Sequence, residues 1–86
     1  MGSAEKTLAK ILSGRSDANI AFRDLRGLLL RLGFEERTKG GHHLFRKSGV
    51  PVLINIQEAG GKAKPYQVRQ VRKVILDYKL MDKGNG

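Results

Sequence analysis

The spacing of apolar residues in the first third of the chain is that of amphipathic helices. In residues 4–12 the apolar positions recur at helical spacing and predict a short helix. Residues 20–33 carry a longer helical stripe, and Gly33 stands where a glycine commonly follows the end of a helix. That stripe consists of Phe22, Leu25, Leu28, Leu29 and Leu32. Two helices, each with one apolar face, are therefore expected before residue 34.

Beyond residue 34 the pattern changes to the alternation that is typical of strands. Residues 34–39, 42–47 and 52–57 predict three strands, and the alternation is clearest in the last of them. In that strand one side is expected to carry Val52, Ile54 and Ile56, and the other Leu53, Asn55 and Gln57. Gly40 and Gly41 permit the positive φ of a tight hairpin turn between the first two strands.

After the third strand the apolar period returns to that of a helix. Residues 48–51 predict a turn, and residues 58–64 a loop rich in glycine and lysine. Residues 65–80 predict a helix, because Pro65 suits a first helical turn and a stripe of apolar residues follows it. The stripe consists of Val68, Val71, Val74, Ile75 and Tyr78. The order of elements predicts an α+β fold, a three-stranded antiparallel sheet with helices packed on one face.

Charge adds the first indication of a partner. The 86 residues include 17 Lys and Arg against 8 Asp and Glu, a formal net charge of +9. Such an excess favours a polyanionic partner, either nucleic acid or an acidic protein, because binding releases counterions. The alternative is a protein that is simply basic. The chain has no cysteine, no apolar run near the ~20 residues that span a bilayer, and no secretory signal, so a cytoplasmic protein without membrane contact is expected.

The stretch "KGGHHLF", residues 39–45, contains both histidines of the chain. A metal site is not expected there. Adjacent residues of a strand point to opposite faces, so His42 and His43 cannot easily hold one ion, and zinc usually takes three or four protein ligands. The nearest carboxylates, on Glu35, Glu36 and Glu58, show no ligand spacing. No metal and no cofactor are therefore expected.

Proton transfer is the other chemistry open to this stretch. Histidine exchanges protons near neutral pH, and metal-free RNA cleavage needs a base for the 2′-hydroxyl and an acid for the leaving 5′-oxygen. A glycine turn with a lysine before it and an arginine after it could hold a phosphate. The alternative is an ordinary surface histidine in a hairpin. Alternation leaves open which histidine is exposed. If Phe45 is buried, then His43 on the same face is buried too and His42 is exposed; if Leu44 is buried, the reverse holds.

The segment from Phe22 to Gln57, followed by "KPYQVRQVRKVI", resembles the HicA toxins of bacterial toxin–antitoxin pairs. The family pattern is a helix ending in Leu-Gly-Phe, a Lys-Gly-Gly-His turn, an aromatic strand and a basic C-terminal helix. Its counterparts here are Leu32–Phe34, Lys39–His42, Phe45 and residues 64–78. The resemblance covers residues 20–80, with residues 1–19 as an N-terminal extension bearing an extra helix and residues 81–86 as a disordered tail.

The resemblance implies a double-stranded-RNA-binding-like fold and a metal-free endoribonuclease, an mRNA interferase. It implies a HicB-like antitoxin as protein partner and mRNA as substrate, and the free protein is expected to be a monomer. The family's catalytic histidine falls on His42 and its turn glycine on Gly40. Members of the family often carry a polar residue at the position of Leu44, which implies that this face points outward and favours His42 as the exposed histidine. Residues expected to contact RNA are Lys39, Gly40, Gly41, His43, Arg46, Lys62 and Lys64.

The chain departs from the family in two places. Residues 1–19 have no clear counterpart, and the loop from Gln57 to Lys64 lacks a second histidine found in many members, so the acid would be His42 itself, Lys39 or water. The competing hypothesis is a non-catalytic RNA-binding module of the same fold. A DNA-binding protein is less favoured, because no helix-turn-helix spacing is evident. The outer arginines of the second helix are expected to be solvated, with an acidic antitoxin as the alternative contact; they are Arg23, Arg26 and Arg31.

Overall fold

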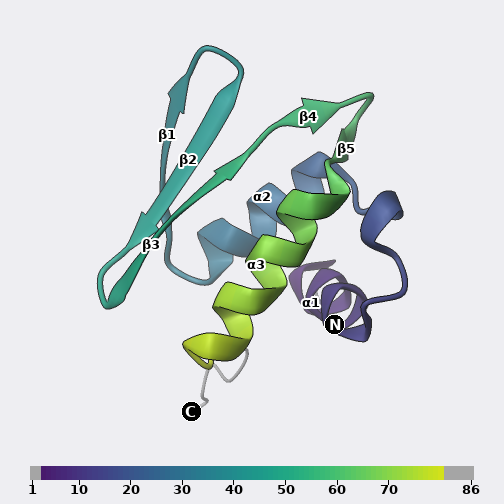
Figure 1. Ribbon diagram of the computed structural model, residues 1–86, viewed down its shortest axis with the longest axis horizontal. Coiled ribbons are helices and arrows are strands. Elements are labelled where there is room, and N and C mark those ends of the chain that lie inside the picture. The colour runs from purple at the N-terminus through teal and green to yellow at the C-terminus, as the bar shows by residue number, and fades with distance from the viewer. Residues whose placement is uncertain (1–2, 81–86) are drawn as a thin grey trace.

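The computed structural model describes residues 3–80 of the chain (Figure 1). Its elements, in chain order, are α1 (Ser3–Ser13), the 3-10 turn η1 (Asp17–Asn19), α2 (Phe22–Arg31), β1 (Glu35–Lys39), β2 (His42–Lys47), β3 (Val50–Ile56), β4 (Glu58–Ala59), β5 (Lys62–Ala63) and α3 (Pro65–Asp77). The expected α+β fold with a three-stranded antiparallel sheet is confirmed. The expected tail, residues 81–86, lies outside the described residues.

The three helices form because each has an apolar stripe to bury. In α2 the buried side chains are those that the sequence pattern indicates, Phe22, Leu25, Leu28 and Leu29. In α3 the stripe of Val68, Val71, Val74 and Ile75 is buried as expected, and Gln67 is buried beside it. The helix ends at Asp77, three residues earlier than the sequence pattern predicts, and Lys79 two residues later adopts a positive φ of 54° that a helix cannot continue through.

The three-stranded sheet has β2 at its centre, paired with β1 on one side and β3 on the other. β3 begins at Val50, earlier than the expected start at residue 52, because the turn before it is short and uses the positive φ of Gly49, 88°. Pro51 is tolerated within β3 because β3 is an edge strand, where a missing backbone donor breaks no ladder.

One face of this sheet is covered and the other is open. Phe45, Ile54 and Ile56 are 0% exposed and belong to the common core with the helices. Of the alternate positions, His42, Arg46 and Leu53 are exposed, and Leu44 and Asn55 are half-buried. Figure 1 shows the three helices gathered together beside the three-stranded sheet. We call the uncovered side of β1, β2 and β3 the outer face.

Residues 58–64 were expected to be a loop, and this expectation was wrong. They contain the small hairpin β4–β5, in which Gly60 and Gly61 both have positive φ, as a type I′ turn requires. The hairpin is held to the chain before α2 by backbone hydrogen bonds from Ala63 to Ile20 and from Phe22 to Gly61. Two-residue strands are too short for alternation to be visible in the sequence, so the glycine pair was the available signal.

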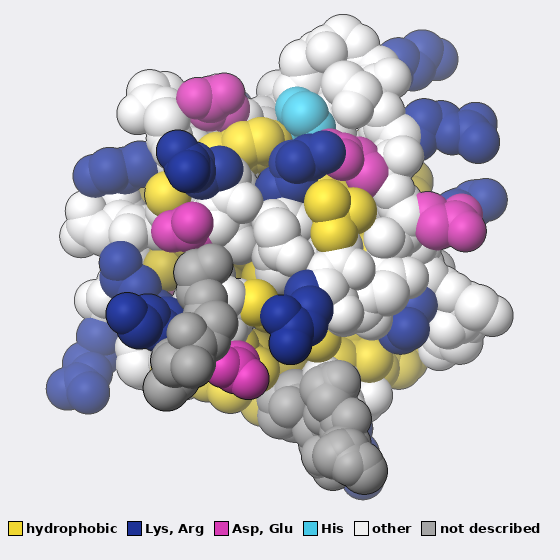
Figure 2. Space-filling model, turned by 180° about the vertical axis from the view of Figure 1, so that it is seen from behind, with side chains coloured by type: hydrophobic (Ala, Val, Ile, Leu, Met, Phe, Trp, Pro, Cys, Tyr) yellow, Lys and Arg dark blue, Asp and Glu magenta, His cyan; other side chains and the backbone are white. Residues whose placement is uncertain are grey.

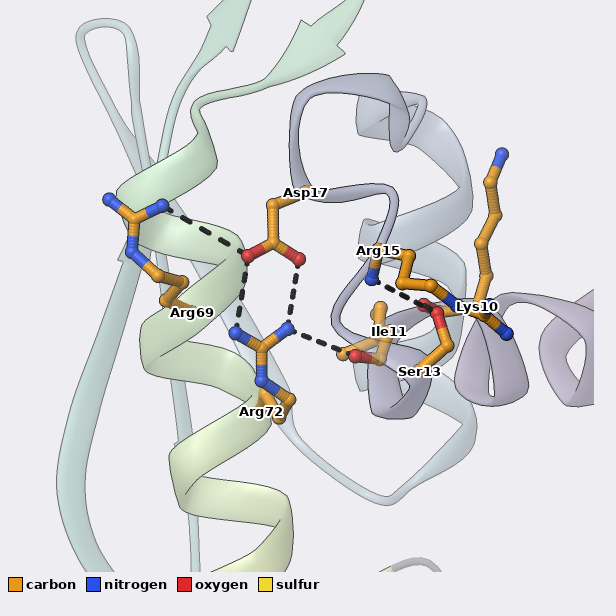
Figure 3. Close-up of polar contacts among 7 residues, drawn as sticks. All are labelled: Lys10, Ile11, Ser13, Arg15, Asp17, Arg69 and Arg72. Carbon is orange, nitrogen blue, oxygen red and sulfur yellow. Dashed lines mark hydrogen bonds and ion pairs between the residues drawn. The ribbon is translucent and has the colours of Figure 1, made fainter.

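The N-terminal segment is tied to the last helix by one arginine (Figure 3). Arg72 of α3 donates to both carboxylate oxygens of Asp17, at 2.8 and 3.1 Å, and to the backbone carbonyl of Ile11, at 3.0 Å. Arg69 lies 4.0 Å from the same carboxylate. Ile11 itself is fully buried in the core. Residues 4–19 are thus packed and hydrogen-bonded to the rest of the fold, and α1 is part of the core.

Candidate functional site

The turn between β1 and β2 presents open backbone. Gly40 has a φ of 61°, whereas Gly41 has no positive φ, so the Gly-Gly pair differs from the I′ turn of β4–β5. A Cβ built on either glycine would meet no atom within 4 Å, which means that nothing in the fold covers the turn. The positive φ, and not crowding, is what favours glycine at position 40. Lys39 and His42 flank this turn as paired residues of the two strands.

His42 lies on the outer face at the start of β2 and is exposed. Its Nδ1 is 3.2 Å from Oδ1 of Asn55 on β3. With the amide oxygen as acceptor, the ring donates its Nδ1 hydrogen, and Nε2 is left as the unprotonated nitrogen of the neutral imidazole. Nε2 can then accept a proton from a molecule approaching the outer face. The contact with Asn55 orients the ring, and in this tautomer Nε2 is the nitrogen that can accept a proton.

His43 points to the opposite side of the sheet and is held by packing. Its ring meets the ring of Phe22 edge-to-face with centroids 4.8 Å apart, and its Nδ1 lies 2.7 Å from Oε2 of Glu36. Arg26 of α2 closes the group with its own hydrogen bonds to Glu36, the Nη2–Oε1 distance being 2.8 Å. The hydrogen bond from Arg26, joined by that from His43, lowers the pKa of Glu36 against the opposing effect of burial. His43 thus links β1, β2 and α2.

The register of the strands defines the rest of the outer face. On β1 its residues are Glu35, Arg37 and Lys39, and on β3 they are Leu53 and Asn55. Between them on β2, Leu44 is paired with Arg37 on one side and with Asn55 on the other. Arg46 follows four residues after His42, about 13 Å along the strand. One imidazole, three cationic side chains, one carboxylate, one amide and two leucines therefore share a single open surface.

The predicted site residues are only partly brought together. Lys39, Gly40, Gly41, His42 and Arg46 lie on the β1–β2 hairpin, whereas His43 faces the helices. Lys62 and Lys64 lie outside the three-stranded sheet, on β5 and just before α3. The ammonium of Lys62 donates to Asn19, at 3.0 Å, and that of Lys64 donates to the side chain of Gln57, at 3.4 Å. Gln57 follows β3 two residues after Asn55, so Lys64 is close to the end of that strand.

Two residues of the outer face carried no functional assignment from the sequence. Arg37 faces outward two positions before Lys39, and the alternation of β1 was the signal that could have identified it. Asn55 was expected on the side of β3 opposite the isoleucines, and it does lie there. Its contact with His42 could not be foreseen, because that contact depends on the register between β2 and β3.

Positive charge is not restricted to the outer face. In the view from behind, Lys and Arg side chains lie around most of the visible surface, with Asp and Glu between them (Figure 2). Among residues 3–80, no group of three or more His, Asp or Glu side chains is placed to hold a metal ion. Within that same range, no helix is both long enough and apolar enough to cross a bilayer.

Comparison with known proteins adds no relative. The chain matches no family model, no curated protein and no solved structure.

Proposed function

We propose that this protein is a metal-free endoribonuclease with His42 as its acid–base residue, the toxin of a HicA-like toxin–antitoxin pair with a double-stranded-RNA-binding-like fold. The observation that carries the proposal is the placement of His42. It is exposed beside an uncovered glycine turn, its ring is oriented by Asn55, and it shares an open face with arginines that form no ion pair within residues 3–80. An imidazole in such a place can act as base and acid on a phosphodiester.

In the proposed reaction, Nε2 of His42 takes the proton of a ribose 2′-hydroxyl. The 2′-oxygen forms a bond to the adjacent phosphorus as the bond from phosphorus to the 5′-oxygen breaks. The departing oxygen takes a proton from the imidazolium, from Lys39 or from water. The products are a 2′,3′-cyclic phosphate and a 5′-hydroxyl end. No redox partner is needed, and protons balance when the ring returns to its neutral form.

The cations of the outer face supply the electrostatic part of the reaction. Lys39 is the direct cross-strand partner of His42. In the proposed reaction its ammonium group contacts the same phosphate. The uncovered backbone of Gly40 and Gly41 allows a phosphate to approach closely. Arg37 and Arg46 make no ion pair with the described acidic residues, so their guanidinium groups are available for phosphates further along the strand.

A toxin of this kind needs a partner that neutralises it, and an acidic HicB-like antitoxin is the partner we propose. The net charge of +9 favours an acidic protein as well as RNA. An antitoxin that covers the outer face would exclude RNA from His42. The two partners would then compete, and added antitoxin should suppress cleavage in proportion to its occupancy of the toxin.

A second candidate is a non-catalytic RNA-binding module. It is favoured by the neighbour of His42, because Asn55 cannot exchange a proton and the chain has no third histidine. The same basic face would bind RNA through phosphates and 2′-hydroxyls in this case.

One experiment separates the two candidates. The purified protein is incubated in EDTA with an end-labelled single-stranded RNA, beside the His42→Ala variant and a His42→Gln variant of similar size. We expect cleavage by the parent protein only, with 5′-hydroxyl ends. Binding by all three proteins without cleavage would establish the RNA-binding module. Equal cleavage by the parent and His42→Ala would show that another group carries the chemistry.

A further inference from the structure

The outer face contains an apolar spot within its cationic surface. Leu44 of β2 is half-buried, and Leu53 of β3 is 51% exposed. Both belong to a shallow hollow of about 200 Å³. The side chains around them are Arg37 and Arg46, together with Glu35 and Glu36. Core packing does not explain this spot, because the helices lie on the other side of the sheet.

The charged side chains around the hollow differ in whether they have an ion-pair partner. Glu36 is committed to Arg26 and His43 on the helix side, so its carboxylate is already neutralised. Arg37 and Arg46 have no ion-pair partner among the described residues, and Glu35 is the remaining acid at the rim. A ligand with an apolar, flat body and an anionic backbone complements two leucines flanked by two free guanidinium groups.

The hollow is adjacent to His42. Leu44 follows His42 by two positions on β2, and both side chains point outward, about 6.6 Å apart along the strand. Asn55, the hydrogen-bond partner of His42, is the cross-strand partner of Leu44. A second shallow hollow continues from the first along the β2–β3 hairpin, and it shares Arg46 and Leu53 with it. A strand of RNA with its phosphate at His42 would therefore pass over Leu44 and Leu53.

We infer that Leu44 and Leu53 form a seat for one nucleobase of a single-stranded RNA, next to the phosphodiester that is cleaved with His42 as the acid–base residue. This inference rests on the proposed function and adds the form of its substrate. A cavity of about 150 Å³ in another protein accommodates benzene, so a hollow of this size suits a single base. A paired base hides its edge and its faces in a stacked duplex, whereas an unpaired base can lay one face on the leucines. Arg37 and Arg46 hold the flanking phosphates.

The test measures binding of labelled single-stranded RNA in a His42→Ala background, which prevents cleavage. Leu53→Ala should weaken binding by about threefold to tenfold, because the base loses apolar contact area. Leu76→Ala is the matched control, since Leu76 is 49% exposed on α3 and should leave the affinity unchanged. Leu53→Tyr should strengthen binding several-fold, because bases stack better on an aromatic ring. Thermal unfolding of each variant confirms that the fold is intact.

A second RNA distinguishes the base from the backbone. An oligomer with abasic residues in its middle should bind Leu53→Ala and the parent equally, because the contact with the base is already lost. If Leu53→Ala and Leu53→Tyr both bind RNA as well as the parent does, the base seat is overturned while the proposed function survives. A protein partner then becomes the occupant of the spot. If the parent neither binds nor cleaves RNA, both proposals are overturned.

Discussion

The two faces of the sheet give neighbouring residues opposite roles. His43 on the covered face is fixed between Phe22 and Glu36, and its ring nitrogen is engaged at 2.7 Å. His42 on the outer face makes one side-chain hydrogen bond within residues 3–80, to Asn55, and its Nε2 makes none there. The same contrast separates Phe45, which is fully buried, from Leu44, which borders a hollow. The side of the strand, and not the residue type, decides whether a residue can act on a ligand.

The largest contrast in stability should come from the pair Phe45 and Leu44. Phe45→Ala removes a fully buried ring from the core, and we expect it to lower the free energy of unfolding by about 3–5 kcal/mol. Leu44→Ala, on the adjacent position, should lower it by less than about 1 kcal/mol. Denaturant unfolding of the two variants measures the difference. Equal losses would mean that the outer face is covered in the native protein.

The histidines should separate activity from stability. His42→Ala should lower the cleavage rate by about 10²- to 10⁴-fold, the usual contribution of an acid–base group, while its unfolding free energy stays within about 0.5 kcal/mol of the parent. His43→Ala should do the reverse. It removes one of the two partners of Glu36 and the ring packed against Phe22, and we expect a loss of about 1–3 kcal/mol with cleavage retained by the folded fraction. Cleavage and denaturation are measured for both variants. A large loss of stability in His42→Ala, or a large loss of cleavage by folded His43→Ala, would contradict these roles.

Asn55 extends the comparison to the acid–base step. Asn55→Ala removes the acceptor that orients the ring of His42, and we expect about tenfold slower cleavage with RNA affinity nearly unchanged. Asn55→Asp supplies a negative charge that favours the imidazolium, so the rising limb of the pH–rate profile should move to higher pH. A profile recorded from pH 5 to 9 for both variants measures this. A profile that stays in place with aspartate would remove Asn55 from the site.

The smallest effect should be the pH dependence of stability that comes from Asp17 in η1. The hydrogen bond from Arg72, with the charges of Arg72 and Arg69, lowers the pKa of Asp17 below its usual value of 3.8. A carboxylate with a lowered pKa in the folded state stabilises the fold above its ordinary pKa, and that stabilisation is lost as the pH falls through the lowered value. Unfolding curves between pH 2 and 6 should show this decline.

Asp17→Asn should flatten the decline, because the amide has no charge to lose. Asp24→Asn is the matched control, since Asp24 forms no ion pair with any other residue between 3 and 80, and its curve should follow that of the parent. An unchanged slope in Asp17→Asn would assign the acid sensitivity to Glu36, whose pKa is lowered by Arg26.

The sequence predicts the elements of this fold well where apolar periodicity is long enough to be read. The stripes of α2 and α3 and the alternation of β3 correspond to buried residues. The β4–β5 hairpin was missed because each of its strands has two residues. Alternation could not decide which of the two histidines is exposed, because Leu44 and Phe45 are both apolar and only one of them enters the core. An apolar residue on an open face, such as Leu44, makes a prediction from alternation ambiguous.

The polar contacts that complete the site and the fold carry no periodic signal. Asn55 meets His42 through the register of two strands, and Asp17 meets Arg72 across 55 positions of sequence. Neither pair has the fixed spacing of a helix turn or a hairpin. Residue types at such positions are visible in the sequence, but the partner of each is decided only by packing.

The hydrogen bonds from Arg72 to Asp17 and Ile11 have a consequence for folding during synthesis. A ribosome adds Arg72 61 positions after Ile11, so the N-terminal segment emerges long before the residue that holds it in place. α3 also supplies the buried stripe on which the other elements pack. The nascent chain therefore remains without a complete core until its last helix has been synthesised, and assembly of the outer face around His42 has to wait for that event.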